Sequence, residues 1–242
     1  MLASTALHPD LAFALDSVSV HVWHTDLAVL ENDTEEQLAI LDEIERLRAS
    51  RLKMEQDRAQ FIAAHAAARM LIGKYLGRPA RTICFGYEPN GKPFAIRSAG
   101  EPDLRFNASR TSNRAAFALT MGREVGIDIE RIADYPHLAE AYARALSANE
   151  RELVSALPTE CERQKAFFAL WVRKEAVLKA GGRGLATAPS EMDVTRATIR
   201  GEAKREWRVK EIACDSGWAA AVAAEGDGWC LGPIRTCREW LS

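Results

Sequence analysis

The chain has 242 residues, with 32 Lys and Arg against 34 Asp and Glu for a formal net charge of −2, and 48% of its residues are hydrophobic. This length and composition predict one large or two small globular domains and exclude a disordered chain. The near balance of charge gives no global reason to expect nucleic-acid or membrane binding, so a charged partner must meet a local patch.

The five cysteines are odd in number and form no CxxC pair. This usage predicts reduced thiols in a cytoplasmic protein and argues against zinc. The N-terminus has no basic segment followed by an apolar run, and no stretch approaches the roughly 18 uninterrupted apolar residues of a membrane span. We therefore expect a chain that is neither exported nor membrane-bound.

The first elements alternate between strand and helix patterns. Residues 18–23 place Val at every second position, which predicts a strand. Residues 33–76 are rich in Ala, Leu, Glu and Arg and lack Pro, which predicts one long or two shorter helices. A strand is expected at 82–85 and a turn at 90–93, where the sequence is NGKP.

The later elements repeat this order. Residues 117–130 predict strands around a turn at 121–124, in a meander-like sheet. Helices are expected at 136–157 and 162–180, the second ended by two glycines, and strands near 207–209 and 218–222. The order of helices, strands, helices and strands predicts an α+β fold.

Two halves of similar plan, residues 1–120 and 121–242, are suggested by a long helix and strands in each. We expect a pseudo-twofold arrangement with the functional site at the junction, because clefts between subdomains commonly bind ligands.

The segment Val125–Glu130 reads as a buried strand that carries two acids. Side chains alternate between the faces of a strand, so Val125 and its alternate neighbours would enter a core while Asp128 and Glu130 share the other face. Two adjacent carboxylates repel each other, and the repulsion is relieved by a cation between them, a shared proton, or exposure to water.

The helix expected at 162–180 carries a charged pair on an apolar arc. At helical spacing Glu175 and Lys179 fall on the same arc as Phe168, Trp171 and Val172. An i,i+4 ion pair on a solvated face is one interpretation. The apolar neighbours favour the other, in which Glu175 supplies a third carboxylate to a cation at Asp128 and Glu130.

These motifs resemble those of Sfp-type 4′-phosphopantetheinyl transferases. The family pattern is a (G/V)(I/V)D(I/V)E segment followed downstream by (W/F)xxKExxxK, and the chain has GIDIE at 126–130 and WVRKEAVLK at 171–179. The turn at 90–93 is similar to the family's GKP turn, and FNASRT at 106–111 to its FNxSHS segment. The resemblance spans about residues 55–190.

The resemblance implies the family fold and a Mg²⁺-dependent reaction. The phosphopantetheine arm of coenzyme A would be transferred to a serine of an acyl or peptidyl carrier protein, with release of 3′,5′-ADP. Asp128, Glu130 and Glu175 would ligate Mg²⁺, and Lys179 would stabilise or protonate the leaving group. The serine proton would pass either to a metal-bound water or to a carboxylate such as Glu175.

The same resemblance places a set of polar side chains against coenzyme A: His65, Arg69, Lys92, Ser109, Arg110, Lys174 and Lys179. Arg110 stands where the family has His, which keeps a phosphate donor but removes a titratable group. His65 stands where Arg is frequent, and a packed core histidine is the alternative.

Two further features carry open alternatives. Glu150 falls where the family often has an acid, or is a solvated glutamate at a helix start. The basic run at 46–58 is either a solvated helix face or a surface for an acidic carrier protein or the adenosine phosphates. Two halves in one chain lead us to expect a monomer.

Two other functions remain open at this point. One is a catalytically weak relative that binds coenzyme A or carrier proteins without transfer, which Arg110 and His65 would suit. The other is a metal-dependent phosphohydrolase that uses the same three acids on another nucleotide.

Overall fold

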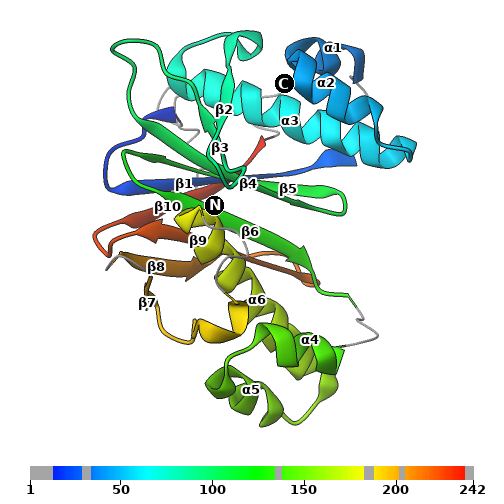
Figure 1. The fold of residues 1–242 in the computed structure, drawn as a ribbon, viewed down its shortest axis with the longest axis vertical. Helices are drawn as coiled ribbons and strands as arrows, with labels where there is room; N and C mark the ends of the chain where they lie inside the picture. Colours follow the sequence, from blue (N-terminus) through cyan, green and yellow to red (C-terminus); the bar gives the residue numbers. More distant parts are fainter. Residues whose placement is uncertain (1–12, 29–33, 134–137, 183–187, 202–204, 238–242) are drawn as a thin grey trace, which may run out of the picture.

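Two four-stranded sheets pack face to face, and a 22-residue helix covers the outer face of each (Figure 1). The structure, a computed structural model, describes residues 13–28, 34–133, 138–182, 188–201 and 205–237. The predicted α+β class is confirmed, and each sheet with its helix forms one of two similar layers.

The first sheet has the order β10-β1-β5-β4, with bounds Cys230–Thr236, Ser19–Asp26, Arg114–Met121 and Leu104–Thr111. β1 and β4 are antiparallel to β5, whereas β10 is parallel to β1. β1 confirms the strand predicted at 18–23. The predicted boundary at residue 120 separates the two sheets except for β10, which returns from the second half of the chain.

The second sheet has the order β6-β9-β8-β7, with bounds Val125–Arg131, Trp218–Glu225, Glu206–Glu211 and Thr198–Arg200, and its neighbours are antiparallel. The strands predicted near 207–209 and 218–222 are confirmed. The predicted meander at 117–130 is wrong, because the turn at 121–124 carries the chain from β5 in one sheet to β6 in the other.

Three helices, not one or two, form within residues 33–76: α1 (Thr34–Ile40), α2 (Glu43–Ser50) and α3 (Glu55–Leu76). Asp42 starts α2 through a capping box with Glu45, which separates α2 from α1. The strand predicted at 82–85 is also wrong. A short 3₁₀ helix, η3 (Ala80–Thr82), precedes a two-stranded hairpin of β2 (Phe85–Tyr87) and β3 (Pro93–Ala95), whose turn is the predicted one.

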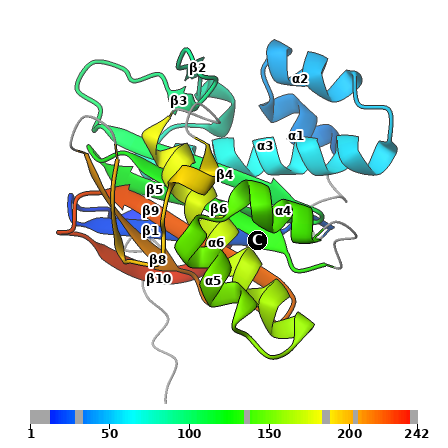
Figure 2. The same ribbon diagram turned by 60° about the horizontal axis from the view of Figure 1, so that its bottom comes forward.

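The second helical region contains α4 (Leu138–Ala145), α5 (Ala148–Ser155), α6 (Glu160–Gly181) and the 3₁₀ helix η5 (Pro189–Glu191). Capping boxes at Ser147 and Thr159 begin α5 and α6. Gly182 ends α6 in the left-handed conformation at φ 65°, where the sequence predicts the stop. In Figure 2 α4 and α5 lie beside α6, and α1 and α2 lie beside α3.

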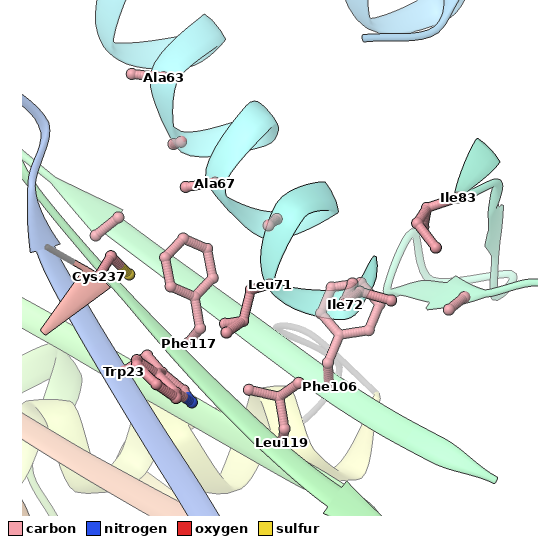
Figure 3. Close-up of a cluster of buried hydrophobic side chains, with 14 of the residues drawn as sticks. Trp23, Ala63, Ala67, Leu71, Ile72, Ile83, Phe106, Phe117, Leu119 and Cys237 are labelled. Atoms are coloured by element: carbon pink, nitrogen blue, oxygen red, sulfur yellow. The ribbon is translucent and has the colours of Figure 1, made fainter. Parts of the chain in front are cut away.

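The strand β5 separates two cores by alternating large and small side chains. Phe117 and Leu119 face α3, whose Ala67 and Leu71 pack against them (Figure 3). Ala116 and Ala118 face the second sheet instead. Small residues on this face allow the two sheets to approach closely.

The two faces of β6 divide as the alternation predicts. Val125, Ile127 and Ile129 are buried between the sheets. On the other face, a Cβ at Gly126 would collide with the backbone of α6 at Ala176 and Ala180. Glycine therefore lets α6 lie directly on β6, beside the acids that follow in the strand.

Candidate functional site

The site forms where two edge strands from different sheets meet. β4 ends the first sheet and β6 ends the second, and the two strands are in contact. Side chains of β4 bridge this seam: the backbone N–H of Ile127 donates to Asn107 Oδ1 at 2.9 Å, and Ser109 Oγ donates to Asp128 Oδ1 at 2.8 Å. The seam brings the FNASRT segment alongside GIDIE.

Asp128 is the most buried acid of the seam, with a side chain 3% exposed. Lys179 Nζ from α6 donates to Asp128 Oδ1 at 2.5 Å and to Ser109 Oγ at 2.9 Å. Lys179 therefore lies at the acids, and its ion-pair partner is Asp128; its predicted role at the leaving group stays a prediction. The ion pair offsets part of the cost of burying the aspartate.

Glu130 and Glu175 lie close enough to Asp128 to be destabilised by its charge. Burial raises the pKa of Glu130, and the charge of Asp128 raises it further, while a 3.0 Å hydrogen bond from Thr111 Oγ1 opposes the shift. Burial also raises the pKa of Glu175, followed by the charges of Asp128 and Glu130, with Lys179 opposing. The three acids thus form one repulsive cluster.

The residues present fit a hard cation. Asp128 Oδ2 is buried and has no hydrogen-bond partner within the part of the chain that the structure describes. A buried carboxylate oxygen without a partner is costly, and an oxygen-binding cation beside two further acids would relieve it. The described residues nevertheless contain no group of three acids, His or Cys already arranged to hold a metal, so the assignment of Asp128, Glu130 and Glu175 as ligands stays a prediction.

A cavity of about 280 Å³ opens on the other side of β4 and contains three of the predicted coenzyme A residues, His65, Ser109 and Arg110. Arg48 of α2 also lines it and packs over the ring of Tyr87 at 5.1 Å. His65 Nδ1 lies 2.8 Å from Glu45 Oε1, and its side chain remains 32% exposed, so it is not a packed core histidine. The cavity combines cationic groups with aromatic walls.

Arg69, predicted to contact coenzyme A, is buried instead. Its Nε donates to Glu45 Oε2 at 2.6 Å, and its two terminal nitrogens donate to Asp42 and to the carbonyl of Ile83. With its side chain 1% exposed, Arg69 ties α2 to α3 and fixes Glu45, the partner of His65. The interpretation of Arg69 as a coenzyme ligand is corrected to a structural role, because protein acceptors already bind all three nitrogens of its guanidinium.

Lys174 is corrected in the same way. Its ammonium group lies 2.7 Å from Glu150 Oε2, with both side chains 0% exposed, and also donates to the carbonyls of Pro189 and Met192. Burial lowers the pKa of Lys174, and the bond to Glu150 opposes this shift. All three donors of the ammonium are used, and Glu150 is not a solvated glutamate.

Lys92 joins the hairpin turn to the second half. Its Nζ donates to Glu124 Oε2 at 2.7 Å and to the carbonyl of Ala180 at 3.0 Å. The side chain is 9% exposed and lies outside the cavity lined by His65. Its predicted contact with coenzyme A stays a prediction, which requires this ion pair to open.

A second cavity, of about 390 Å³, is lined by Glu130 and is mostly apolar. Phe167, Phe168 and Trp171 of α6 line it, together with Arg144 of α4. It was not expected from the sequence, because α4 has no motif that predicts it. A further hollow of about 610 Å³ near residues 94–105 contains none of the predicted site residues.

Asn107 and Thr111 are the seam residues that sequence reasoning missed. Both occupy alternate positions with Ser109, so all three share a face once 104–111 is a strand. No strand was predicted there, and the signal was therefore not available. No described helix is both long and apolar enough to cross a bilayer, and no disulfide joins the five cysteines within the described ranges.

Comparisons with known proteins cover the segments that form this site. Residues 124–225, which hold GIDIE and the α6 motif, match the model of the 4′-phosphopantetheinyl transferase superfamily. The chain is 34% identical over 240 residues to the 4′-phosphopantetheinyl transferase HetI of Nostoc sp., covering 95% of this chain and 97% of that protein.

More distant similarities cover less. The human L-aminoadipate-semialdehyde dehydrogenase-phosphopantetheinyl transferase is 25% identical over 201 residues, which span 74% of this chain and 65% of that one. The crystal structure of Thermotoga maritima holo-[acyl-carrier-protein] synthase covers 43% of this chain and 63% of its own at 18% identity, with a TM-score of 0.32. On the full-length match to HetI and the family model, the chain belongs to the 4′-phosphopantetheinyl transferase superfamily of enzymes.

Proposed function

We propose that this chain transfers the 4′-phosphopantetheine arm of coenzyme A to a serine of an acyl or peptidyl carrier protein, with Mg²⁺, and releases 3′,5′-ADP. The observation that carries the proposal is the cluster of Asp128, Glu130 and Glu175, in which a buried oxygen of Asp128 lacks a partner. Mg²⁺ bound there would neutralise the pyrophosphate of coenzyme A and the charge that develops during transfer.

The protein's own residues would supply the remaining steps. The serine oxygen forms a bond to the phosphorus that bears the arm, and the bond from that phosphorus to 3′,5′-ADP breaks. Glu175 would accept the serine proton, because α6 presents it beside the other two acids. Lys179 would stabilise the phosphate that leaves, since its ammonium already lies at Asp128.

Two cavities would suit separate ends of the coenzyme. Arg48 and Arg110 place cationic donors around the first cavity, and His65 adds an imidazole, a set that would suit the adenosine phosphates. The apolar cavity lined by Glu130 would suit an uncharged arm near the reacting phosphorus. Both halves of one chain contribute to this arrangement, so we also infer that a monomer is sufficient.

The test is the mass of an apo-carrier protein after incubation with the enzyme, coenzyme A and Mg²⁺. We expect a gain equal to the phosphopantetheine arm, its loss with Asp128→Ala or a chelator, and its retention with Asp227→Ala, which alters an exposed aspartate beyond β9. If the Asp128→Ala variant still transfers the arm when a chelator is present, the metal assignment is wrong.

The same experiment separates the two alternatives. No gain in mass with any of several carriers, together with tight coenzyme A binding, would indicate a binding relative. Release of 3′,5′-ADP at a rate that carrier protein does not change would indicate a phosphohydrolase.

A further inference from the structure

At the seam with β6, side chains of β4 form the hydrogen bonds that backbone groups form between neighbouring strands of a sheet. Edge strands present unpaired N–H and C=O groups, and two such edges meet here without joining into one sheet. The amide of Ile127, which would pair in a ladder, donates instead to the side chain of Asn107. The orientation of β6 therefore depends on specific polar side chains from the neighbouring strand.

Each alternate residue of β4 holds a different point of β6. Asn107 binds the backbone at Ile127, Ser109 binds Asp128, and Thr111 binds Glu130. Ser109 also accepts a hydrogen bond from Lys179 and lines the first cavity, so its substitution would disturb several functions. Thr111 is the cleaner case, because among the described residues its hydroxyl bonds to a single acid, Glu130.

The contact of Thr111 with Glu130 constrains the carboxylate directly. Thr111 Oγ1 donates to Glu130 Oε2 at 3.0 Å. The branched side chain of threonine has few rotamers, so the hydroxyl has a well-defined position. Glu130 otherwise borders the largely apolar second cavity, into which an unrestrained carboxylate would be free to swing away from Asp128.

We propose that Thr111 is a positioning residue that holds Glu130 beside Asp128 so that both acids can bind one cation. The inference rests on the proposed function, since it assumes the metal site. Groups that orient a metal ligand typically contribute about tenfold to a hundredfold in metal affinity. Thr111 would act through Glu130 and not through contact with coenzyme A.

The experiment measures Mn²⁺ binding by electron paramagnetic resonance, without coenzyme A or carrier protein. Thr111→Val keeps the shape of the side chain and removes the hydroxyl, and we expect its Mn²⁺ affinity to fall about tenfold. Thr111→Ser keeps the hydroxyl and should restore affinity to within about twofold of the unmodified chain. Thr198→Val, the same change on an exposed position of β7, should bind normally. If Thr111→Val does not fold, Thr111→Ala is measured in its place.

The outcomes separate this inference from the proposed function. Normal Mn²⁺ affinity in the variant without the hydroxyl, or equal weakening in Thr111→Ser, would overturn the role of Thr111. An unmodified chain that does not bind Mn²⁺, or that binds it equally with Asp128→Ala, would overturn the metal site itself. The second readout is the melting temperature of each variant in a chelator. If Thr111 only positions Glu130, Thr111→Val should keep the melting temperature of the unmodified chain while its metal affinity falls. A purely structural residue would lower both.

Discussion

His21 lies in β1 with 5% of its surface exposed, and its Nδ1 is 2.7 Å from the hydroxyl of Tyr75 in α3. Burial lowers the pKa of His21 to about 4, and the positive charge of Arg235 in β10 adds to this effect, whereas Asp16 opposes it. The histidine is therefore neutral in the folded protein at physiological pH.

The depressed pKa predicts lower stability in mild acid. As pH falls below 6.5, the ordinary value, the unfolded chain binds a proton that the folded chain resists until about pH 4. This difference removes about 3 kcal/mol from the free energy of unfolding across that window. Urea denaturation between pH 7.5 and 4.5 measures the free energy of unfolding across this window. In His21→Asn this free energy should fall less steeply with decreasing pH. Equal slopes for the two proteins would show that another group is responsible.

The two incorrect assignments to coenzyme A have the same physical cause. Arg69 and Lys174 were placed against coenzyme A by motif, but Glu45 and Glu150 occupy their donors. Each of these partners lies on another helix, so only the tertiary structure reveals the pair. The two acids of β6 were placed on the correct face because alternation is a local property of the strand.

The contact between β6 and α6 depends on one glycine. A side chain at Gly126 would meet the backbone of α6, which cannot move as a flexible side chain can. We expect Gly126→Ala to destabilise the protein by about 3 kcal/mol, at the upper end of ordinary overpacking, and to reduce transfer by displacing Lys179 from Asp128. Thermal or urea unfolding and the carrier mass assay measure the two effects.

Gly228→Ala is the matched control, because a Cβ there has nothing within 4 Å. It should change stability by less than about 1 kcal/mol. If both variants are equally stable and active, α6 does not need to approach β6 closely.

Elements were predictable where their pattern is internal and were missed where another element completes them. α6 combines a capping box, an apolar arc and two terminal glycines, and its bounds lie close to the prediction. β4 carries Asn107, Ser109 and Thr111 on one face. Asn is depleted in strands, and this polar face gains its partners only when β6 is present to bind it. The meander predicted at 117–130 was wrong for the same reason, because only tertiary packing places β5 and β6 in different sheets.

The core between the two sheets is formed by both layers, which predicts that the layers unfold together. Val20 and Val22 of β1 pack against Ile127, Ile129 and other apolar residues of the second sheet. Separating the layers would expose this entire surface to water. We therefore expect a single cooperative transition, with coincident midpoints from tryptophan fluorescence and far-UV circular dichroism.

Tryptophan variants change the contribution of each layer to the fluorescence, because the chain has six tryptophans and each variant removes one. Trp23→Phe removes a reporter in the first sheet, and Trp207→Phe removes one in the second. The remaining fluorescence of each variant should still report one midpoint that matches its circular dichroism. Midpoints that differ between the two variants would show that the two layers unfold independently, the first layer including β10.

The return of β10 to the first sheet has a consequence for the growing chain. β1, β4 and β5 leave the ribosome before any strand of the second sheet, yet β10, which pairs with β1, follows them all. During synthesis the outer edge of β1 therefore waits unpaired while the second sheet is made, and its backbone groups can bind another nascent chain. We therefore expect assembly of this enzyme to be vulnerable to aggregation until β10 has been translated.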